Sequence, residues 1–335
     1  MEKILIVPMI VGFFTTLFLI PFWIRKAKQI GLIWEDMHKP GHPKNVAGSG
    51  GMIVLMSFIF GVLVYIAIKT FVLETNVVTI EIFALLATVL IAGLTGFVDD
   101  VFGWARGGLS AKFRIILLLF AAVPLMVINA GEDVVMGINF GLYYPLFFIP
   151  LGIIGAATTF NFIAGYNGLE SSQGILILSA LAYVTWLSGN SWLSVICLIM
   201  VACLLAFYLF NIYPARTFPG DVLTYSTGAL IAIVAILGNI ERVAVLFFIP
   251  YIIETGLKIR GKLKKESFAE VKEDGSLENR YEKFYGLEHI AVFLLKKIKK
   301  NGKVYETNVV YLINLFQILI IGIGLLLFKL HIFVS

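Results

Sequence analysis

The sequence contains little charge, and this already excludes one class of protein. Only 14% of its 335 residues are charged and 59% are hydrophobic, whereas soluble domains carry about 25% charged residues. A single water-soluble core could not bury so much apolar surface, so a soluble globular protein is excluded. The apolar residues form continuous runs rather than the alternating pattern of a membrane β-barrel, and helices are therefore expected.

Residues that commonly build disulfides or metal sites are also scarce. The only cysteines, Cys197 and Cys203, lie six residues apart within one apolar run. We interpret them as small core residues rather than as part of a disulfide framework. His38 and His42 have the spacing of metal ligands, but lysines lie beside them, so we do not expect a metal there.

Ten apolar runs approach the roughly 20 residues that a membrane-spanning helix needs. They are Ile4–Ile24, Met52–Leu73, Ile82–Val98, Phe113–Ala130, Tyr144–Phe162, Gly174–Gly189, Trp192–Tyr213, Val222–Gly238, Arg242–Ile259 and Thr307–Phe333. Basic residues follow the first run, whereas in a signal peptide they precede it, so this run is expected to be a retained helix. We predict an all-α polytopic membrane protein of about ten helices, forming a single domain over residues 1–335.

The basic residues indicate the orientation of these helices. Of the 26 Lys and Arg residues, 22 lie in the loops that follow odd-numbered runs. The other four are Lys3, Lys69, Arg242 and Lys329. Because cytoplasmic loops are enriched in Lys and Arg, we expect the odd loops in the cytoplasm and both termini on the extracytoplasmic side. The net charge of +5 then reports orientation, and no nucleic-acid partner is expected.

Residues 258–306 form the one large loop, which lies between the last two runs and is expected to be cytoplasmic. Within it, the stretch from His289 to Lys300 combines apolar and basic residues. This pattern predicts a short amphipathic helix lying along an anionic bilayer surface.

Polar residues gather at the ends of several runs on the cytoplasmic side. They are Asp99, Asp100, Lys112, Arg114, Asn161, Asn167 and Asp221, together with the glycine-rich segment Gly48–Gly51. Each has an ordinary explanation, such as a helix cap, a turn, a snorkelling cation or flexible loop. These explanations do not account for why the polar residues all lie on the cytoplasmic side while the opposite side has almost none.

The chemistry of these side chains points to phosphates and a divalent cation. Mg²⁺ prefers oxygen ligands and is commonly held by one or two carboxylates together with substrate phosphates. Asp221, Asn161 and a pyrophosphate would form such a set. Lys112 and Arg114 could offset phosphate charge, and Asp99 or Asp100 could accept a proton or act as a further metal ligand.

Taken together, these motifs resemble the polyprenyl-phosphate N-acetylhexosamine-1-phosphate transferase family over nearly the whole chain. The resemblance implies a ten-helix membrane enzyme with a cytoplasmic active site. Such an enzyme transfers a sugar-1-phosphate from a UDP-sugar to a lipid phosphate and releases UMP. It implies Mg²⁺ as cofactor, with Mn²⁺ as an alternative.

Motifs shared with the family indicate which residues of this sequence correspond to the family's site residues. The resemblance implies Asp99, Asp100 and Lys112 as catalytic residues and Asn161 and Asp221 as metal ligands. It also implies a set of substrate-binding residues: Lys39, Gly48, Ser49, Arg114, Asn167, Gly168, Leu169, Glu170, Arg216, Arg260, Lys264 and Lys265. The last three are the nearest basic group to the position of an Arg-His-Arg cluster that the eukaryotic members carry and this sequence lacks.

The segment Ala164-Gly-Tyr-Asn-Gly-Leu-Glu170 is similar to the eukaryotic, dolichyl-phosphate branch of the family. We therefore expect transfer of GlcNAc-1-phosphate to a polyprenyl or dolichyl phosphate, the first step of lipid-linked oligosaccharide assembly. Alternatives are a cell-wall transferase using another UDP-sugar and, from another class, a transporter or lipid flippase. The sequence also leaves open a homodimer, and either direct attack or a covalent aspartyl intermediate.

Overall fold

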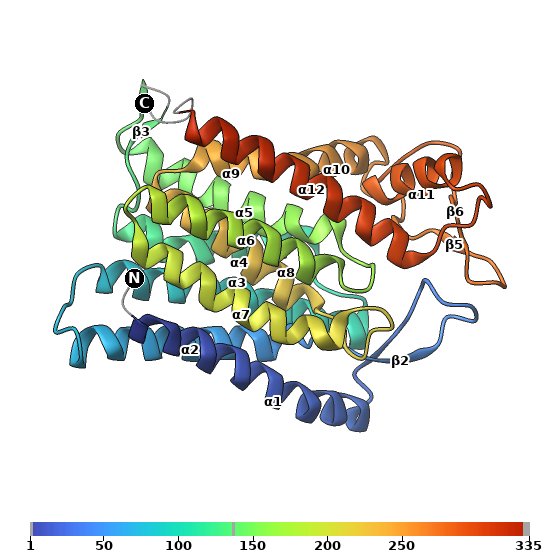
Figure 1. Ribbon diagram of the computed structural model, residues 1–335, viewed down its shortest axis with the longest axis horizontal. Helices are drawn as coiled ribbons and strands as arrows, with labels where there is room; N and C mark the ends of the chain where they lie inside the picture. Colours follow the sequence, from blue (N-terminus) through green and yellow to red (C-terminus); the bar gives the residue numbers. More distant parts are fainter. Residues whose placement is uncertain (1–2, 136–137, 331–335) are drawn as a thin grey trace.

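A computed structural model describes residues 3–135 and 138–330 of the chain. The long helices lie side by side with their axes roughly along one direction (Figure 1). The helices are α1 (Val7–Ile30), α2 (Gly51–Phe71), α3 (Thr79–Arg106), α4 (Ala111–Val127), α5 (Ile149–Phe160), α6 (Leu169–Leu187), α7 (Ser191–Asn211), α8 (Gly220–Gly238), α9 (Glu241–Phe247), α10 (Ile249–Arg260), α11 (Leu287–Ile298) and α12 (Glu306–Lys329). Short helical turns η1 (Lys3–Ile6), η2 (Tyr144–Phe148) and η3 (Asn161–Ile163) extend three of the segments.

Three two-stranded antiparallel ribbons complete the described part of the chain. They pair β1 (Ile33–Glu35) with β2 (Lys44–Ala47), β3 (Val134–Val135) with β4 (Ile138–Asn139), and β5 (Glu270–Val271) with β6 (Leu277–Glu278). The predicted all-α class is therefore correct for the bundle, and strand occurs only in loops.

Seven helical segments of the described chain are long and apolar enough to cross a bilayer. Outer helix faces carry apolar side chains such as Phe18 and Phe120, each more than 60% exposed, which suits contact with lipid tails. The chain is thus an integral membrane protein. The predicted runs that became α4, α6 and α9–α10 are also helical, but their crossing of the bilayer stays a prediction, as does the total of ten. The end of the tenth run, residues 331–333, lies outside the described residues.

Two expected helix boundaries were wrong. The run Arg242–Ile259 is divided at Phe248 into α9 and α10. Pro250 explains the break, because proline has no backbone N–H to donate to the preceding turn. The third run, predicted to end at Val98, continues as α3 to Arg106, so the two adjacent aspartates lie inside a helix rather than at its end.

Helix α8 forms the centre of the bundle, where it packs against α3, α5 and α2. Every residue from Val222 to Ile236 is buried. Cys197 and Cys203 on α7 are free thiols in the same hydrophobic core, as expected.

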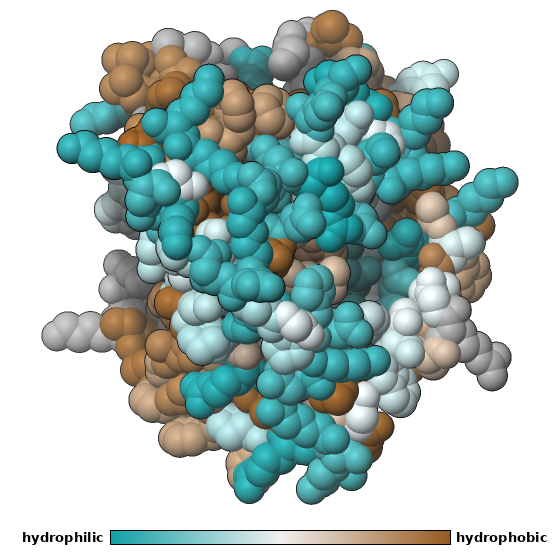
Figure 2. Space-filling view, turned by 90° about the vertical axis from the view of Figure 1, so that its right-hand side faces the viewer, coloured by the Kyte–Doolittle hydropathy of each residue, from teal (hydrophilic) through white to brown (hydrophobic). Residues whose placement is uncertain are grey.

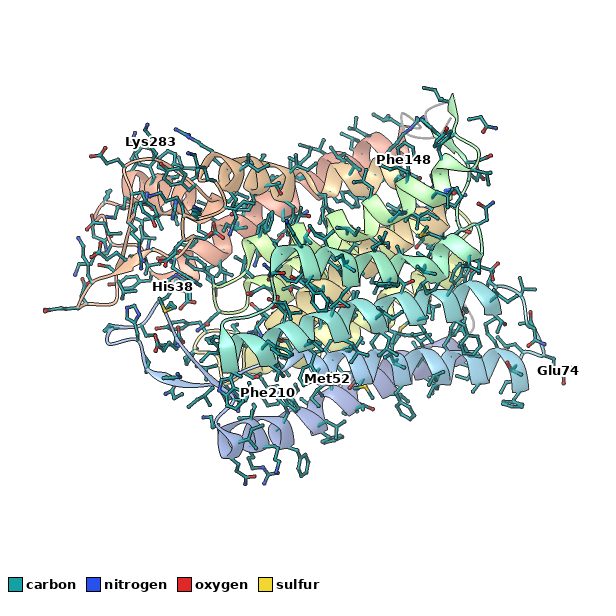
Figure 3. The ribbon with its side chains drawn as sticks, turned by 180° about the vertical axis from the view of Figure 1, so that it is seen from behind. His38, Met52, Glu74, Phe148, Phe210 and Lys283 are labelled. Atoms are coloured by element: carbon teal, nitrogen blue, oxygen red, sulfur yellow. The ribbon has the colours of Figure 1, made fainter. Side chains whose placement is uncertain are left out.

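The two ends of the bundle differ in character. The ribbons β1–β2 and β5–β6 lie at one end together with α11, and we call this the polar end; α1 begins and α12 ends at the opposite end (Figure 1). Figure 2 shows mainly hydrophilic residues over the polar end. In Figure 3, His38 and Lys283 lie toward this end, whereas Glu74 and Phe148 lie toward the other. The helix predicted between His289 and Lys300 is confirmed as α11, which runs from Leu287 to Ile298, and its position along the bilayer surface stays a prediction.

Two glycines allow α3 and α8 to touch near the polar end. A Cβ atom on Gly96 of α3 would lie 2.2 Å from the backbone oxygen of Asp221. Gly220, the first residue of α8, has a φ of +71°, and a Cβ there would lie 2.2 Å from a carboxylate oxygen of Asp100. Side chains at either position would separate the two helices.

We expect Gly96→Ala to destabilise the protein by about 1–3 kcal/mol, because the added methyl group meets rigid backbone rather than a movable side chain. Thermal unfolding in detergent measures this. Gly155→Ala on α5 is the matched control, since a Cβ there would have no other atom within 4 Å. Equal melting temperatures for the two variants would contradict the proposed close contact.

Candidate active site

A cavity of about 760 Å³ lies at the polar end of the bundle. Its walls come from the first loop, α3, the segment between α5 and α6, the start of α8, and the chain that follows α10. Seven of the predicted site residues line it: Ser49, Asp100, Asn161, Asn167, Glu170, Asp221 and Lys265. These residues are spread over the sequence, and the fold brings them together.

The start of α8 organises one wall of the cavity. The Asn161 amide donates a 3.0 Å hydrogen bond to the Asp221 carboxylate. Asp100, from α3, accepts a 2.7 Å bond from the backbone N–H of Asp221 and a longer one from Val222. Because the first N–H groups of a helix have no partner within the helix, Asp100 caps α8 from a neighbouring element.

The neighbouring aspartate faces a different helix. Asp99 accepts a 2.7 Å bond from the backbone N–H of Leu109 and forms a 3.0 Å ion pair with Arg114 on α4. Arg114 also lies 3.4 Å from the Tyr225 hydroxyl. Successive helical residues point about 100° apart, so the two aspartates bond to different backbone groups and only Asp100 lines the cavity, although Asp99 also lies within hydrogen-bonding reach of the Asp221 side chain.

The two basic residues predicted on α4 also differ. Arg114 is half-buried in its pair with Asp99, whereas the Lys112 side chain is exposed and does not line the cavity. The structure therefore brings Arg114, and not Lys112, to the acidic group. The catalytic role of Lys112 stays a prediction that rests on the family resemblance.

The glycine-rich first loop is attached to the segment that precedes α8. The Phe218 N–H donates to the Ala47 carbonyl at 2.8 Å, and the Gly50 N–H donates back to the Phe218 carbonyl at 2.8 Å. This pairing holds Ser49 on the cavity wall. The Gly48 carbonyl instead accepts a 2.8 Å bond from the indole of Trp23 on α1, so Gly48 joins the loop to the bundle.

Two predicted substrate-binding cations do not line the cavity. Lys39 pairs with Asp36 and lies over the ring of Tyr213, 5.0 Å from its centroid. Arg216 lies over the ring of Phe210 at 4.5 Å. Both side chains are held by neighbours that the sequence analysis did not identify.

The predicted segment from Asn167 to Glu170 is the start of α6. Gly168 has a φ of +83° at the N-cap and Leu169 is fully buried, so neither lines the cavity. Glu170 accepts a 2.7 Å bond from the backbone N–H of Gly165. Asn167 and Glu170 therefore face the cavity, and the two residues between them build the turn.

The segment after α10 closes another side. Lys265 lines the cavity and lies over the Tyr281 ring at 4.7 Å. Arg260 and Lys264 are exposed and do not line it. Of the three basic residues predicted here, the structure brings one to the cavity.

The sequence analysis did not identify several residues of the cavity wall. They are the aromatic residues Trp34, Tyr166 and Phe268, and the lysines Lys44 and Lys258. Burial raises the pKa of the Tyr166 hydroxyl well above its usual value, which keeps it protonated. Aromatic residues in polar loops were the only available signal, and such residues are too common to single these out.

The residues of the cavity wall could hold a cation such as Mg²⁺ only if a bound substrate supplied further oxygen ligands. Among the residues that the structure describes, no group of three or more His, Cys, Asp and Glu side chains is placed to hold a metal ion. Asp221 and Asn161 supply oxygen atoms of the kind Mg²⁺ prefers, but substrate oxygens and water would have to complete the shell.

The sequence of this chain is similar to those of known proteins. The model of glycosyl transferase family 4 matches residues 82–239, which include Asp99, Asp100, Asn161, Asn167 and Asp221. A protein of Saccharolobus solfataricus named putative UDP-N-acetylglucosamine–dolichyl-phosphate N-acetylglucosaminephosphotransferase is 34% identical over 92% of both chains.

Two more distant relatives extend the comparison. The UDP-N-acetylglucosamine–dolichyl-phosphate N-acetylglucosaminephosphotransferase of Dictyostelium discoideum is 27% identical over 70% of this chain and 66% of its own. A phospho-N-acetylmuramoyl-pentapeptide-transferase of Streptococcus pyogenes is 26% identical over 73% of this chain and 76% of its own.

We expect Arg114→Gln to lower the free energy of unfolding by about 1.5–3 kcal/mol, because it removes a charged hydrogen-bond partner from buried Asp99. Lys112→Gln, two residues earlier on the same helix, should change it by less than about 0.5 kcal/mol. Chemical unfolding in detergent distinguishes the two. A larger loss for Lys112→Gln would mean that the lysine holds the acidic group.

Proposed function

The chain belongs to glycosyl transferase family 4, and on that premise we propose that it transfers GlcNAc-1-phosphate from UDP-GlcNAc to a polyprenyl phosphate, such as dolichyl phosphate, with release of UMP. This reaction would begin the assembly of a lipid-linked oligosaccharide. The observation that carries the proposal is the group of Asp100, Asn161 and Asp221 at the start of α8, on the wall of a cavity at one end of a membrane bundle.

The charges of this group favour a phosphate substrate bound with a cation. The dipole at the N-terminus of α8 favours an anion, and two of the first N–H groups of this helix are already bonded to Asp100. Asp100 and Asp221 would repel that anion, and a divalent cation bound at this wall would offset the repulsion. We propose that Asp221 and Asn161 hold Mg²⁺, with Mn²⁺ as an alternative. When bound, the ion would neutralise part of the negative charge of the pyrophosphate.

Of the two adjacent aspartates, Asp100 has the access that catalysis requires. Both oxygens of Asp99 are bonded, one to Leu109 and the other to Arg114, and Asp99 does not line the cavity. We therefore propose that Asp100 faces the substrates and steers the attacking lipid phosphate, while Asp99 acts through Arg114. Phosphoryl transfer needs mainly positioning and charge neutralisation. Lys112 would contribute to the latter if its exposed side chain swings toward a bound phosphate.

The location of the cavity also fits a lipid acceptor. The basic residues that surround the polar end favour its placement in the cytoplasm by the positive-inside bias. A water-soluble nucleotide sugar would then enter from the cytoplasm, and a polyprenyl phosphate from the bilayer. The cavity lies at one end of the bundle, whereas transporters usually place their sites near the midplane, and this favours a transferase.

The relatives favour GlcNAc over other sugars. The relative whose name specifies UDP-N-acetylglucosamine and dolichyl phosphate matches 92% of this chain at 34% identity. The phospho-N-acetylmuramoyl-pentapeptide-transferase matches less of it at lower identity. A cell-wall transferase therefore remains the second candidate within the family.

We expect Asp221→Asn to reduce Mg²⁺-dependent UMP release by about 100-fold or more, since it removes the charge that would hold the cation without changing side-chain size. Purified protein with UDP-GlcNAc and dolichyl phosphate provides the assay. Asp274→Asn is the matched control, because Asp274 is exposed and pairs with Lys303 away from the cavity. Normal turnover by Asp221→Asn would remove Asp221 from the proposed metal site.

Donor choice is tested on the same wild-type protein. We expect UMP release with UDP-GlcNAc and at least tenfold less with UDP-GalNAc or UDP-MurNAc-pentapeptide, because buried polar groups discriminate strongly against a donor that leaves them unpaired. Each donor is tried with dolichyl and with undecaprenyl phosphate. Preference for UDP-MurNAc-pentapeptide would support the cell-wall alternative.

A further inference from the structure

Two buried carboxylates meet on Asn167 from opposite ends of the chain. Asp36 follows β1 and Glu306 is the first residue of α12, and each is only 2% exposed. Glu306 accepts a 2.6 Å hydrogen bond from the backbone N–H of Asn167. Asp36 accepts a 3.2 Å bond from the side-chain amide nitrogen of the same residue. Neither carboxylate lines the cavity, whereas Asn167 does.

The contact with Asp36 determines which end of the Asn167 amide is available. An ionised carboxylate can only accept hydrogen bonds, so it requires the NH₂ end of the amide to face it. Lys39 forms an ion pair with the same carboxylate. The carbonyl oxygen of Asn167 is then the end left for a ligand in the cavity.

The same wall is fixed by aromatic packing. Beyond Asp36, the next buried residue, His38, stacks on Tyr166 with ring centroids 3.8 Å apart. His38 also lies 3.7 Å from Glu306, so the first loop and the start of α12 contact each other as well as Asn167. Figure 3 shows His38, a residue of the first loop, at the polar end.

We propose that Asp36 and Glu306 are positioning residues for donor binding. Asp36 orients the Asn167 amide so that its oxygen accepts a hydrogen bond from the bound nucleotide sugar, and Glu306 holds the backbone of Asn167 in place. This inference rests on the proposed function, because it takes a nucleotide sugar as the ligand of the cavity. Neither carboxylate touches the donor.

Asp36→Asn tests the orientation directly. An asparagine at this position can accept or donate, so either end of the Asn167 amide can face it. We expect the KM for UDP-GlcNAc to rise about tenfold with little change in kcat, the effect of losing one charge-assisted hydrogen bond. UMP binding, measured by calorimetry without turnover, should weaken by a similar factor. Glu278→Gln is the control for removal of a carboxylate at the same end of the molecule, because the Glu278 side chain on β6 is 45% exposed and does not line the cavity.

A double-mutant cycle separates orientation from a general loss of structure. In an Asn167→Ala background there is no amide to orient, so Asp36→Asn should then leave KM unchanged. Additive effects of the two substitutions would overturn the proposal for Asp36. For Glu306, we expect Glu306→Ala to raise KM and Glu306→Gln, which keeps an accepting oxygen, to restore most of the affinity. Equal losses in both variants would overturn that role.

The wild-type protein distinguishes failure of this inference from failure of the proposed function. If wild type binds UMP and the variants bind it equally well, the positioning role is wrong and the transferase function stands. If wild type neither binds UMP nor uses UDP-GlcNAc, the proposed function is wrong and the inference falls with it.

Discussion

The N-terminus of α8 is the constraint on which the site depends. Its free N–H groups lie inside the bundle, and an unpaired buried N–H costs about 1–3 kcal/mol. Asp100 satisfies this requirement from α3, accepting from Asp221 at 2.7 Å. The contact needs α3 and α8 to approach closely, which Gly96 and Gly220 permit. The helix that supports the cavity is thereby fixed by the same carboxylate that faces into it.

Properties that depend on local composition could be predicted from the sequence. Each of the ten predicted apolar runs is largely helical in the structure, and the basic loops identified the end at which β1–β2, β5–β6 and α11 gather. The errors came from backbone and angular detail within those segments. Pro250 divided one expected helix, and α3 continued past the aspartates. Asp99 and Asp100, which read as a pair in the sequence, face different neighbours because a helix turns about 100° per residue.

The candidate site was predicted in part for a similar reason. Asn161 and Asp221 lie at helix ends and Asp100 follows a predicted apolar run, and successive runs that cross a membrane bring such positions to the same side. Lys39 and Arg216 were correctly placed at that side, but long side chains find partners that depend on tertiary packing, here Asp36 and Phe210. The same holds for Glu306, whose contact with Asn167 spans 139 positions of sequence and has no local signature.

Asp36 and Glu306 both bond to Asn167, and this has a consequence for the order in which the site forms during synthesis. The first emerges early from the ribosome and the second only when α12 is being made. A nascent chain that stops before α12 already holds Asp100, Asn161 and Asp221, but the wall around Asn167 is unfinished. If Glu306 has the proposed positioning role, full affinity for a nucleotide sugar would thus arise only once the start of α12 is in place.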